Sequence, residues 1–432
     1  MTRRGADWYH RAEMGISGSL VHDWPNVPIE RAQGCYAYGP NGETYMDFCG
    51  GMATNNTGHC HPKVVAAIKE QAERLIHGPM GVLLYEPIVR LAEELAKVTP
   101  DGLNSFFFLN SGSEAVEGAI KMARYVTSRP GIVSFVGGFH GRTMGAASLT
   151  TSKSKYRKHY EPLMGGVYQI PYPYCFRCPC GLTEGSCNLK CFHFVQDLFD
   201  HCIQPSEVSC FIIEPILGEG GYVVAPPEYL AKLREVCTEN GILLVFDEVQ
   251  SGFGRTGTMF AAQGVGVTPD IMAIAKGIAS GMPLSATVSS RELMSQWTAG
   301  AHGTTFGGNP VSCAAALATL EVFREENLLE NTRRQGSRAM EFLKKLKAKY
   351  TVIGDVRGRG LMIGIELVEP VDGHTPNPGA VESVLQRCLD RGLVLYPAGT
   401  YSQVIRFIPP LIVADDELDK ALDIFEQAVA SL

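Results

Sequence analysis

A chain of 432 residues, 45% hydrophobic and 19% charged, has the balance of an ordinary globular protein and can bury the cores of two or three domains. Its formal net charge of -7 and its lack of a basic block argue against nucleic-acid partners and against attachment to an anionic membrane surface. The N-terminal MTRRGADWYH has no apolar core like that of a secretory signal, and no apolar run reaches the length of a bilayer span, so we expect no membrane association.

The first 60 residues contain short strand-like pieces, and two amphipathic helices are predicted after them. The first, in HPKVVAAIKEQAERLIHG, starts at Pro62 and stops at Gly78, and the second lies in EPIVRLAEELAKV. From residue 105, fully apolar runs such as CFIIEP and ILLVFDEV alternate with helical segments. This alternation predicts a parallel sheet whose two faces are both covered by helices.

The last third of the chain mixes long helices, of which PVSCAAALATLEVFREEN is the first, with strands such as LMIGIELV and VIRFIPP. This mixture predicts a separate, smaller α+β domain. We therefore expect an N-terminal segment (1–60) that packs with the small domain, a large domain (61–310) with a cysteine-rich insertion (173–202), and the small domain itself (311–432).

A Ser/Gly turn separates the apolar strand SFFFL from the helix predicted in SEAVEGAIK. Backbone N–H groups at a helix start lack an intrahelical acceptor, so those of Gly112 and Ser113 would form an anion site suited to phosphate. A plain N-terminal cap, with Glu117 near the first turn, explains the same residues without a ligand.

Two carboxylates, Asp247 and Glu248, end the apolar strand ILLVF. Ligands of open α/β sheets bind outside the carboxyl ends of the strands, and a carboxylate buried there must be paired because an unpaired buried charge is costly. A surface turn with solvated acids is the alternative.

A lysine, Lys276, follows the apolar run IMAIA. Apolar surroundings lower the pKa of a lysine by desolvation, and the neutral amine then serves as a nucleophile and base, as Schiff-base lysines require. Most lysines are simply solvated, so this signal alone is weak.

The three signals together fit the needs of pyridoxal phosphate. A phosphate cradle anchors the cofactor, a carboxylate keeps the pyridine nitrogen protonated, and a lysine holds the aldehyde. The motifs around them, in this order, resemble those of the class III (ω-amino acid) aminotransferases of fold type I, and most of all the 4-aminobutyrate aminotransferases. The resemblance runs from about residue 25 to the C-terminus and rests on MDFCGGMATNNTGHCHPKV, NSGSEAVEGAIKMAR, GGFHGRTMGA, IIEPILGEGG, VFDEVQSGFGRTG, AIAKGIASGMPL, GTTFGGNPVSCAAA and VRGRGLMIGIEL. It implies a large domain with a mostly parallel seven-stranded sheet covered by helices, plus a smaller α+β domain.

The resemblance also implies a role for each matching cofactor residue. Lys276 would be the Schiff-base lysine and Asp247 the partner of the pyridinium nitrogen. The other cofactor-binding positions are Gly112 and Ser113 at the phosphate, Thr305 at the phosphate of the neighbouring subunit's cofactor, Phe139 and Val249 on the two ring faces, Gln250 at the ring hydroxyl, Glu214 near Gln250, and His140. Core packing for Phe139 and a loop cap for Thr305 are the plainer alternatives.

Substrate residues follow in the same way. Arg406 matches the arginine that binds an α-carboxylate, and Arg142 matches the one that binds the distal carboxylate of 4-aminobutyrate. Glu219 resembles a switch glutamate that neutralises Arg406 when the donor has no α-carboxylate. Met52 takes the place of an apolar residue that lines the pocket. An ordinary ion-paired strand arginine is the alternative for Arg406.

The resemblance implies a ping-pong aminotransferase that moves an amino group from an ω-amino acid or related amine to 2-oxoglutarate, in a homodimer or larger homo-oligomer. An amino-acid racemase or epimerase of the same fold is the main alternative, because every cofactor residue would be unchanged. A decarboxylase is a weaker one, and a catalytically silent, metal-dependent binding protein is the alternative from another class.

Thirteen cysteines occur in the chain, most of them single within apolar stretches, which suits a reducing compartment and predicts a cytoplasmic location. The exception is PYCFRCPCGLTEGSCNLKC, where Cys175-x2-Cys178 and Cys187-x3-Cys191 bracket a Gly-containing loop. This spacing suits a structural zinc or an iron–sulfur cluster, and disulfides or reduced thiols in a small satellite core remain as alternatives.

Overall fold

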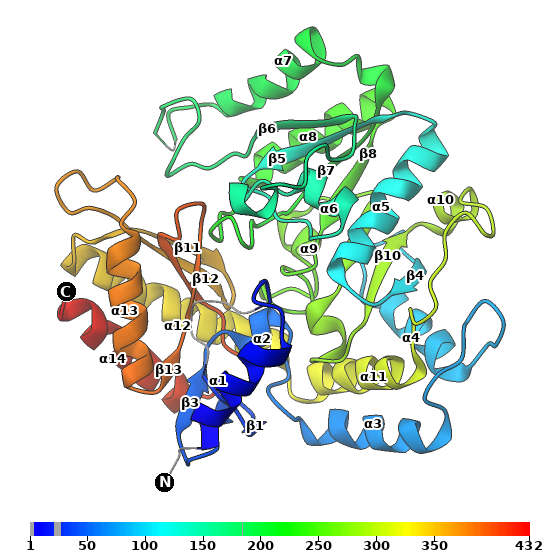
Figure 1. The fold of residues 1–432 in the computed structure, drawn as a ribbon. Helices are drawn as coiled ribbons and strands as arrows, with labels where there is room; N and C mark the ends of the chain where they lie inside the picture. The colour runs from blue at the N-terminus through cyan, green and yellow to red at the C-terminus, as the bar shows by residue number, and fades with distance from the viewer. Residues whose placement is uncertain (1–3, 21–26, 184) are drawn as a thin grey trace.

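The computed structural model describes residues 4–20, 27–183 and 185–432, and its centre is a seven-stranded sheet (Figure 1). The strand order is β4-β10-β9-β8-β7-β5-β6. The pairs from β9 to β6 are all parallel, whereas β10 runs antiparallel to both of its neighbours. The predicted mostly parallel sheet is therefore confirmed. Its strands are β4 (Ser105–Leu109), β5 (Gly131–Val136), β6 (Val167–Pro171), β7 (Val208–Ile213), β8 (Leu243–Asp247), β9 (Ile271–Ile274) and β10 (Ser285–Ser289).

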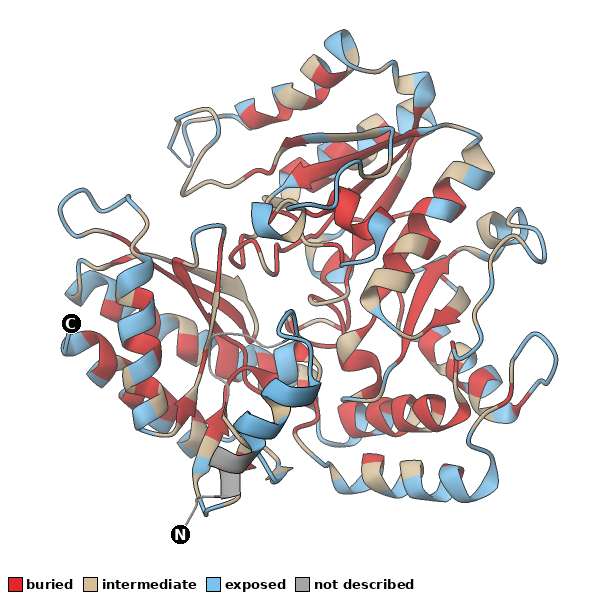
Figure 2. Cartoon of the chain, in the orientation of Figure 1, coloured by how far each residue is buried: buried red, intermediate tan, exposed pale blue. Residues whose placement is uncertain are grey.

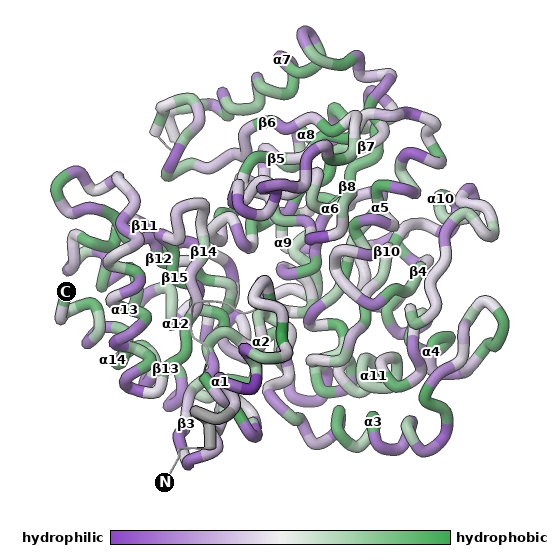
Figure 3. Tube along the Cα trace, viewed as in Figure 1, coloured by the Kyte–Doolittle hydropathy of each residue, from purple (hydrophilic) through white to green (hydrophobic). Residues whose placement is uncertain are grey.

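Helices cover both faces of this sheet, as the continuous apolar runs predict (Figure 2). Successive residues of a strand point to opposite faces, so Ile132 and Cys210 pack with one set of helices, and Val133 and Phe211 with the other. Hydrophobic residues are accordingly dense along the central strands (Figure 3). The first face is covered by α5 (Gly112–Thr127) and α6 (Met144–Leu149), the second by α7 (His193–His201) and α8 (Pro227–Asn240).

The C-terminal region is an antiparallel four-stranded sheet with three long helices beside it, which agrees with the α+β prediction. The strand order is β11-β12-β15-β14. The elements are α12 (Leu328–Lys349), β11 (Ile353–Arg359), β12 (Met362–Leu367), α13 (Pro378–Asp390), β14 (Tyr396–Ala398), β15 (Val404–Phe407) and α14 (Asp415–Ala430).

The N-terminal segment is joined to this C-terminal region by strand pairing. Its last strand, β3 (Thr44–Asp47), runs parallel to β13 (Leu393–Val394) in a second four-stranded sheet. The division of the chain into domains at residues 60 and 310 stays a prediction. The remaining elements of this sheet and its surroundings are α1 (Arg4–Gly15), β1 (Arg31–Gln33), β2 (Tyr36–Tyr38) and α2 (Gly50–Ala53).

Three helices pack together beside the large sheet: α3 (Pro62–Arg74), α4 (Glu86–Ala96) and α11 (Pro310–Glu325) (Figure 1). The predicted start of α3 at Pro62 is confirmed, but the helix ends at Arg74 rather than at Gly78. The reason is that Leu75 adopts extended backbone angles, which break the helical hydrogen-bond pattern before the glycine is reached. Within the described ranges, every helix is too short or too polar to traverse a bilayer.

Candidate active site

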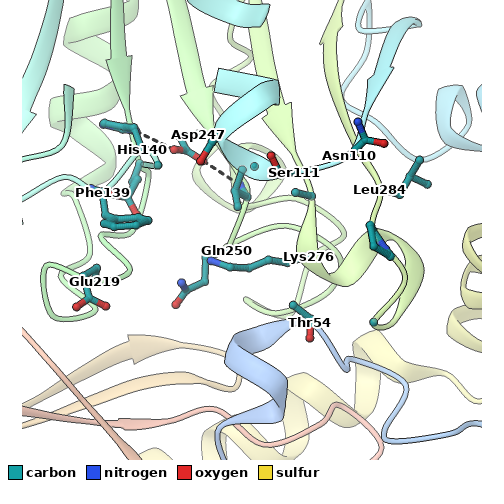
Figure 4. A pocket seen from close by; sticks show the side chains of 18 of the residues that line it. Thr54, Asn110, Ser111, Phe139, His140, Glu219, Asp247, Gln250, Lys276 and Leu284 are labelled. Carbon is teal, nitrogen blue, oxygen red and sulfur yellow. Dashed lines mark hydrogen bonds and ion pairs between the residues drawn. The ribbon is translucent and has the colours of Figure 1, made fainter. Parts of the chain in front are cut away.

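A cavity of about 310 Å³ lies at the carboxyl ends of the sheet strands (Figure 4). Ser111 and Gly112 follow β4, Glu214 follows β7, Asp247 ends β8 and Lys276 follows β9, and all of them line this cavity. Side chains far apart in sequence meet here because the carboxyl ends of parallel strands share one edge of the sheet. The sequence-predicted signals at residues 112, 247 and 276 therefore form one site.

The start of α5 offers two unpaired backbone donors to the cavity. Ser111 caps the helix: its Oγ accepts the N–H of Glu114 over 3.3 Å, and a Glu114 carboxylate oxygen accepts the N–H of Ser111 over 2.9 Å. The capping acid is thus Glu114 rather than Glu117. The N–H groups of Gly112 and Ser113 come next and have no acceptor among the described residues, as expected for the first turn of a helix. The helix cap and the predicted anion site can therefore exist together, because they use different N–H groups.

The glycine at this helix start is required by close packing. A Cβ on Gly112 would lie 2.8 Å from a methyl carbon of Val249. Val249 follows β8 and also lines the cavity, so any side chain at position 112 would push it out of place.

Asp247 is buried and points into the cavity with two partners. Its Oδ2 lies 2.7 Å from Nδ1 of His140, and its Oδ1 accepts the N–H of Val249 over 3.0 Å. Burial by itself lowers the pKa of His140, but the hydrogen bond and the charge of Asp247, together with the charge of Glu214, outweigh it and leave that pKa raised. The result is a buried carboxylate held by an imidazole.

The neighbouring acid, Glu248, is also buried but faces away from the cavity, so the alternative of a surface turn with solvated acids is wrong. Its carboxylate accepts three hydrogen bonds, from the hydroxyl of Ser251 and the N–H groups of Ala261 and Ala262. Adjacent strand residues point in opposite directions, so Asp247 lines the cavity whereas Glu248 stabilises the surrounding backbone.

Lys276 follows β9 in a left-handed backbone conformation, with a φ of 50°, and its side chain extends into the cavity (Figure 4). Burial lowers its pKa to about 8, although the negative charges of Asp247 and Glu214 act in the opposite direction. A lysine in this state is easily deprotonated, as a nucleophile or proton carrier must be.

Glu214, Phe139 and Gln250 also line the cavity. Glu214 is buried and accepts the N–H groups of Phe139 and Gly218, each over 2.8 Å. Burial raises the pKa of this carboxyl to about 7. The Oε1 atom of Gln250 is buried and has no hydrogen-bond partner within the described chain, which leaves an acceptor ready for a donor in the cavity.

The far end of the site is built around Glu219 and Arg406. Arg406, on β15, is only 2% exposed, and its guanidinium pairs with the Glu219 carboxylate and donates to the carbonyl of Pro397 over 2.9 Å. The other carboxylate oxygen of Glu219 accepts the hydroxyl of Tyr156 over 2.9 Å and lies 3.6 Å from Nζ of Lys153. Burial raises the pKa of Glu219, but the two cations and the tyrosine hydroxyl outweigh it and leave that pKa lowered.

Sequence reasoning missed Lys153 and Tyr156. They lie in a segment without regular hydrophobic periodicity, and only tertiary folding brings them to Glu219. The nearest available signal was their position a few residues beyond the FHGRT stretch.

Four predicted site residues lie outside the lining of this cavity in the single chain. One of them, Arg406, contacts the lining residue Glu219 through the ion pair described above, and the other three lie further away. Arg142 is exposed, with its guanidinium carbon 3.9 Å from the centre of the Tyr156 ring. Met52 is 39% exposed, and Thr305 is exposed and lines a separate hollow beside Phe306.

The family model for class-III aminotransferases matches residues 19–429. The chain is a class-III aminotransferase. It is 41% identical to a 5-aminovalerate aminotransferase of Pseudomonas aeruginosa, over 94% of both chains, and 40% identical to a 4-aminobutyrate aminotransferase of Escherichia coli, over 92% of both. It is also 40% identical to an alanine/serine racemase of Pyrococcus horikoshii, over 96% of this chain and 87% of that one. Among solved structures, it is similar to the PLP-bound form of an amine transaminase from an uncultivated Pseudomonas species, with a TM-score of 0.89, 32% identity and coverage of 96% and 97% of the two chains.

Class-III aminotransferases depend on pyridoxal phosphate, and the residues of this one fit that cofactor. The two unpaired N–H groups at the start of α5 suit a phosphate. The buried Asp247 suits a protonated ring nitrogen, and the unsatisfied Gln250 oxygen suits a hydroxyl donor. The amine of Lys276 completes a donor set for an anionic, aromatic aldehyde.

The cysteine-rich insertion of this aminotransferase lies outside the cavity. Cys175, Cys178, Cys187 and Cys191 line one small apolar hollow. However, no group of three or more His, Cys, Asp or Glu side chains in the described ranges could hold a metal ion, so the predicted zinc or iron–sulfur site has no support. None of the thirteen cysteines, all of them in described segments, forms a disulfide. Burial raises the pKa of Cys191 to about 11, as expected for reduced thiols in a satellite core.

The pKa of Lys276 gives a test that needs no substrate. Because burial lowers it to about 8, the amine becomes neutral and nucleophilic as the pH rises through about 8. In the cofactor-free protein, we expect the rate of acetylation at Lys276 to rise with pH to a midpoint near that value and then level off. Mass spectrometry of the labelled peptide measures this, with the exposed Lys158 as an internal reference for the reagent. A midpoint above about pH 10 would contradict the lowered pKa.

Proposed function

We propose that this aminotransferase takes the amino group of an ω-amino acid, such as 4-aminobutyrate or 5-aminovalerate, and transfers it to 2-oxoglutarate by a ping-pong mechanism. The observation that carries the proposal is the buried ion pair of Arg406 with Glu219. A buried arginine masked by a mobile carboxylate serves an enzyme that alternates between substrates with and without an α-carboxylate. The names of the 5-aminovalerate and 4-aminobutyrate relatives support the same substrate class.

The cofactor is held by residues from four strand ends. The N–H groups of Gly112 and Ser113 would bind its phosphate, and Asp247, held by His140, would pair with its ring nitrogen. Phe139 and Val249 would contact the ring and Gln250 its hydroxyl, while Glu214 accepts the backbone N–H of Phe139. This assignment is supported by their shared position around one cavity.

Lys276 carries the proton in the chemical step. The bound cofactor supplies an electron sink that stabilises negative charge on the substrate carbon. With the cofactor bound, the neutral amine of Lys276 would accept a proton from that substrate carbon and, as the ammonium, donate it again in the next step; a lowered pKa favours the neutral amine.

Two arginines, Arg142 and Arg406, would bind the carboxylates of the substrates. Arg142, stacked over Tyr156, is placed to meet the distal carboxylate of an ω-amino acid. Arg406 binds the α-carboxylate of 2-oxoglutarate or glutamate once Glu219 releases it. When Arg406 binds a substrate carboxylate, the charge of Glu219 still has partners, because Tyr156 and Lys153 lie beside its other carboxylate oxygen.

A donor and acceptor screen tests the function. We expect amino transfer from 4-aminobutyrate or 5-aminovalerate to 2-oxoglutarate, with alanine and plain amines poorer as donors and pyruvate and glyoxylate poorer as acceptors. The 40% identity to an alanine/serine racemase makes racemisation the second candidate. Incubation with a single L-amino acid and no oxo acid separates the two, since only a racemase would form the D-isomer. Appearance of that isomer, with no transfer from any ω-amino acid, would overturn the proposal.

Substitution of Glu219 by glutamine should separate the two kinds of substrate. The neutral amide cannot offset Arg406, so a donor without an α-carboxylate would bind next to an unpaired buried cation. We expect kcat/KM for 4-aminobutyrate to fall about 10- to 100-fold, and kcat/KM for glutamate to change less than about threefold. Equal losses for both donors would exclude the switch role.

We also propose that the enzyme works as a homodimer in the cytoplasm. The segment of residues 76–84 exposes a row of apolar side chains, and the ring of His77 in it contacts the ring of Phe306, next to Thr305, at a tilt of 43°. A second copy of the chain would cover this surface and bring Thr305 to the phosphate of the neighbouring cofactor. The exposed apolar side chains are Ile76, Met80, Val82, Leu83, Leu84 and Phe306. Light scattering of the purified protein checks the oligomeric state.

The absence of disulfides among the described residues supports the proposed cytoplasmic, reducing compartment.

A further inference from the structure

The cysteine-rich insertion contacts the C-terminal region through a charged side chain, that of Arg177. Arg177 lies between Cys175 and Cys178, and its Nε donates to a carboxylate oxygen of Glu366 over 2.6 Å. The same guanidinium donates to the carbonyl of His374 over 2.7 Å. Glu366 is on β12 and its side chain is 0% exposed, so its charge depends entirely on protein partners.

Glu366 links the insertion to a second arginine. Its other oxygen lies 2.7 Å from Nη1 of Arg357, on β11, and also accepts the hydroxyl of Tyr174, from the start of the insertion. Arg357 in turn donates to the carbonyl of Gly221, from Nε over 3.0 Å and from Nη2 over 2.6 Å. One buried carboxylate therefore connects the insertion to residue 221.

Gly221 closes the turn that carries Glu219. Its N–H donates to the carbonyl of Gly218 over 3.1 Å, and its φ of 115° is a backbone conformation that any residue with a side chain would adopt only under strain. The second anchor of the turn is the N–H of Gly399, which donates to the carbonyl of Glu219 over 2.9 Å. From the C-terminal region, the backbone of this turn is thus held at two points, by Gly399 at the carbonyl of Glu219 and by Arg357 at the carbonyl of Gly221.

We propose that Arg177 is a positioning residue: through Glu366 and Arg357 it fixes the turn that carries Glu219, and so sets the preference between substrates with and without an α-carboxylate. Loss of Arg177 leaves an oxygen of a fully buried carboxylate without its partner. Arg357 is the adjacent cation, and a shift of its guanidinium toward that oxygen weakens the two bonds to Gly221. The proposal rests on the ω-amino acid function given above.

Kinetics of Arg177→Met in the cofactor-loaded enzyme tests the coupling. We expect kcat/KM for the ω-amino donor to fall about five- to tenfold relative to kcat/KM for glutamate, in the same direction as for Glu219→Gln. Arg177→Lys should restore part of the difference, since it keeps the charge. Lys190→Met removes an exposed cation of the same insertion with no contact to Glu366, and should leave both values unchanged. If Arg177→Met does not fold, Tyr174→Phe removes another partner of Glu366 and should shift the ratio in the same direction, by a smaller factor.

Two further measurements separate positioning from general destabilisation. In the Glu219→Gln background, Arg177→Met should change the donor ratio by less than about twofold, because the group it positions is already gone. Amide hydrogen exchange should become faster at residues 218–223 in Arg177→Met, also without substrate. Equal loss for all donors, with unchanged exchange in that segment, would overturn the proposal. A wild-type enzyme that accepts no ω-amino donor would refute the proposed function, while the exchange experiment would still report on the coupling.

Discussion

Replacement of Lys276 by alanine is expected to lower the turnover number by at least about 10³-fold. Lys276 follows β9 and lines the same cavity as Asp247, with its amine reaching into that cavity (Figure 4). Its amine, with a pKa lowered to about 8 by burial, is assigned both the link to the cofactor and the proton transfer. Steady-state rates with an ω-amino donor and 2-oxoglutarate measure the loss.

Chemical rescue distinguishes loss of the proton carrier from loss of the fold. The alanine variant should still bind pyridoxal phosphate, because the phosphate donors at Gly112 and Ser113 and the carboxylate of Asp247 are unchanged. A small added amine can enter the space left by the lysine and should restore a measurable fraction of the rate. Turnover within about tenfold of the wild type, without added amine, would rule out the assignment of Lys276.

The sequence was informative about this site wherever a local pattern had a direct spatial meaning. Residues 112, 247 and 276 each follow an apolar strand, and in a parallel sheet such positions converge on one edge. The covered sheet was predictable for the same reason, because strands buried on both faces are apolar at every position. The sequence could not decide by itself whether Asp247 or Glu248 faces the cavity, since either may point inward depending on how the strand is rotated.

Features that depend on tertiary contacts were not predictable. Lys153 and Tyr156 reach Glu219 only after an irregular segment folds over the cavity, and no periodicity announces them. The spacing of the cysteine pairs fitted a metal site, but spacing fixes neither the direction of the thiols nor the distance between the pairs. The link from Arg177 through Glu366 to Arg357 joins three distant parts of the chain, so it becomes visible only in the folded structure.

Replacement of Asp247 by asparagine is expected to lower the turnover number by about 10²–10³-fold with little change in overall fold. The neutral amide has nearly the same shape but no charge to keep the cofactor ring nitrogen protonated. It also ends the ionic contact with His140, whose raised pKa depends on Asp247 and would therefore fall. The pH dependence of the rate should change together with its magnitude.

The adjacent Glu248→Gln variant is the matched control for Asp247→Asn. It makes the same chemical change, one residue away, at a carboxylate that is equally buried but turned from the cavity. Its amide would place a donor against the N–H groups of Ala261 and Ala262, so we expect about 1–3 kcal/mol lower stability. The turnover number of the folded protein should nevertheless stay within about threefold of the wild type. Thermal unfolding and steady-state rates of the two variants would then differ: Asp247→Asn would lose turnover and Glu248→Gln would lose stability. A similar loss of turnover in both variants would mean that catalysis requires a buried charge at this strand end rather than contact with the cofactor.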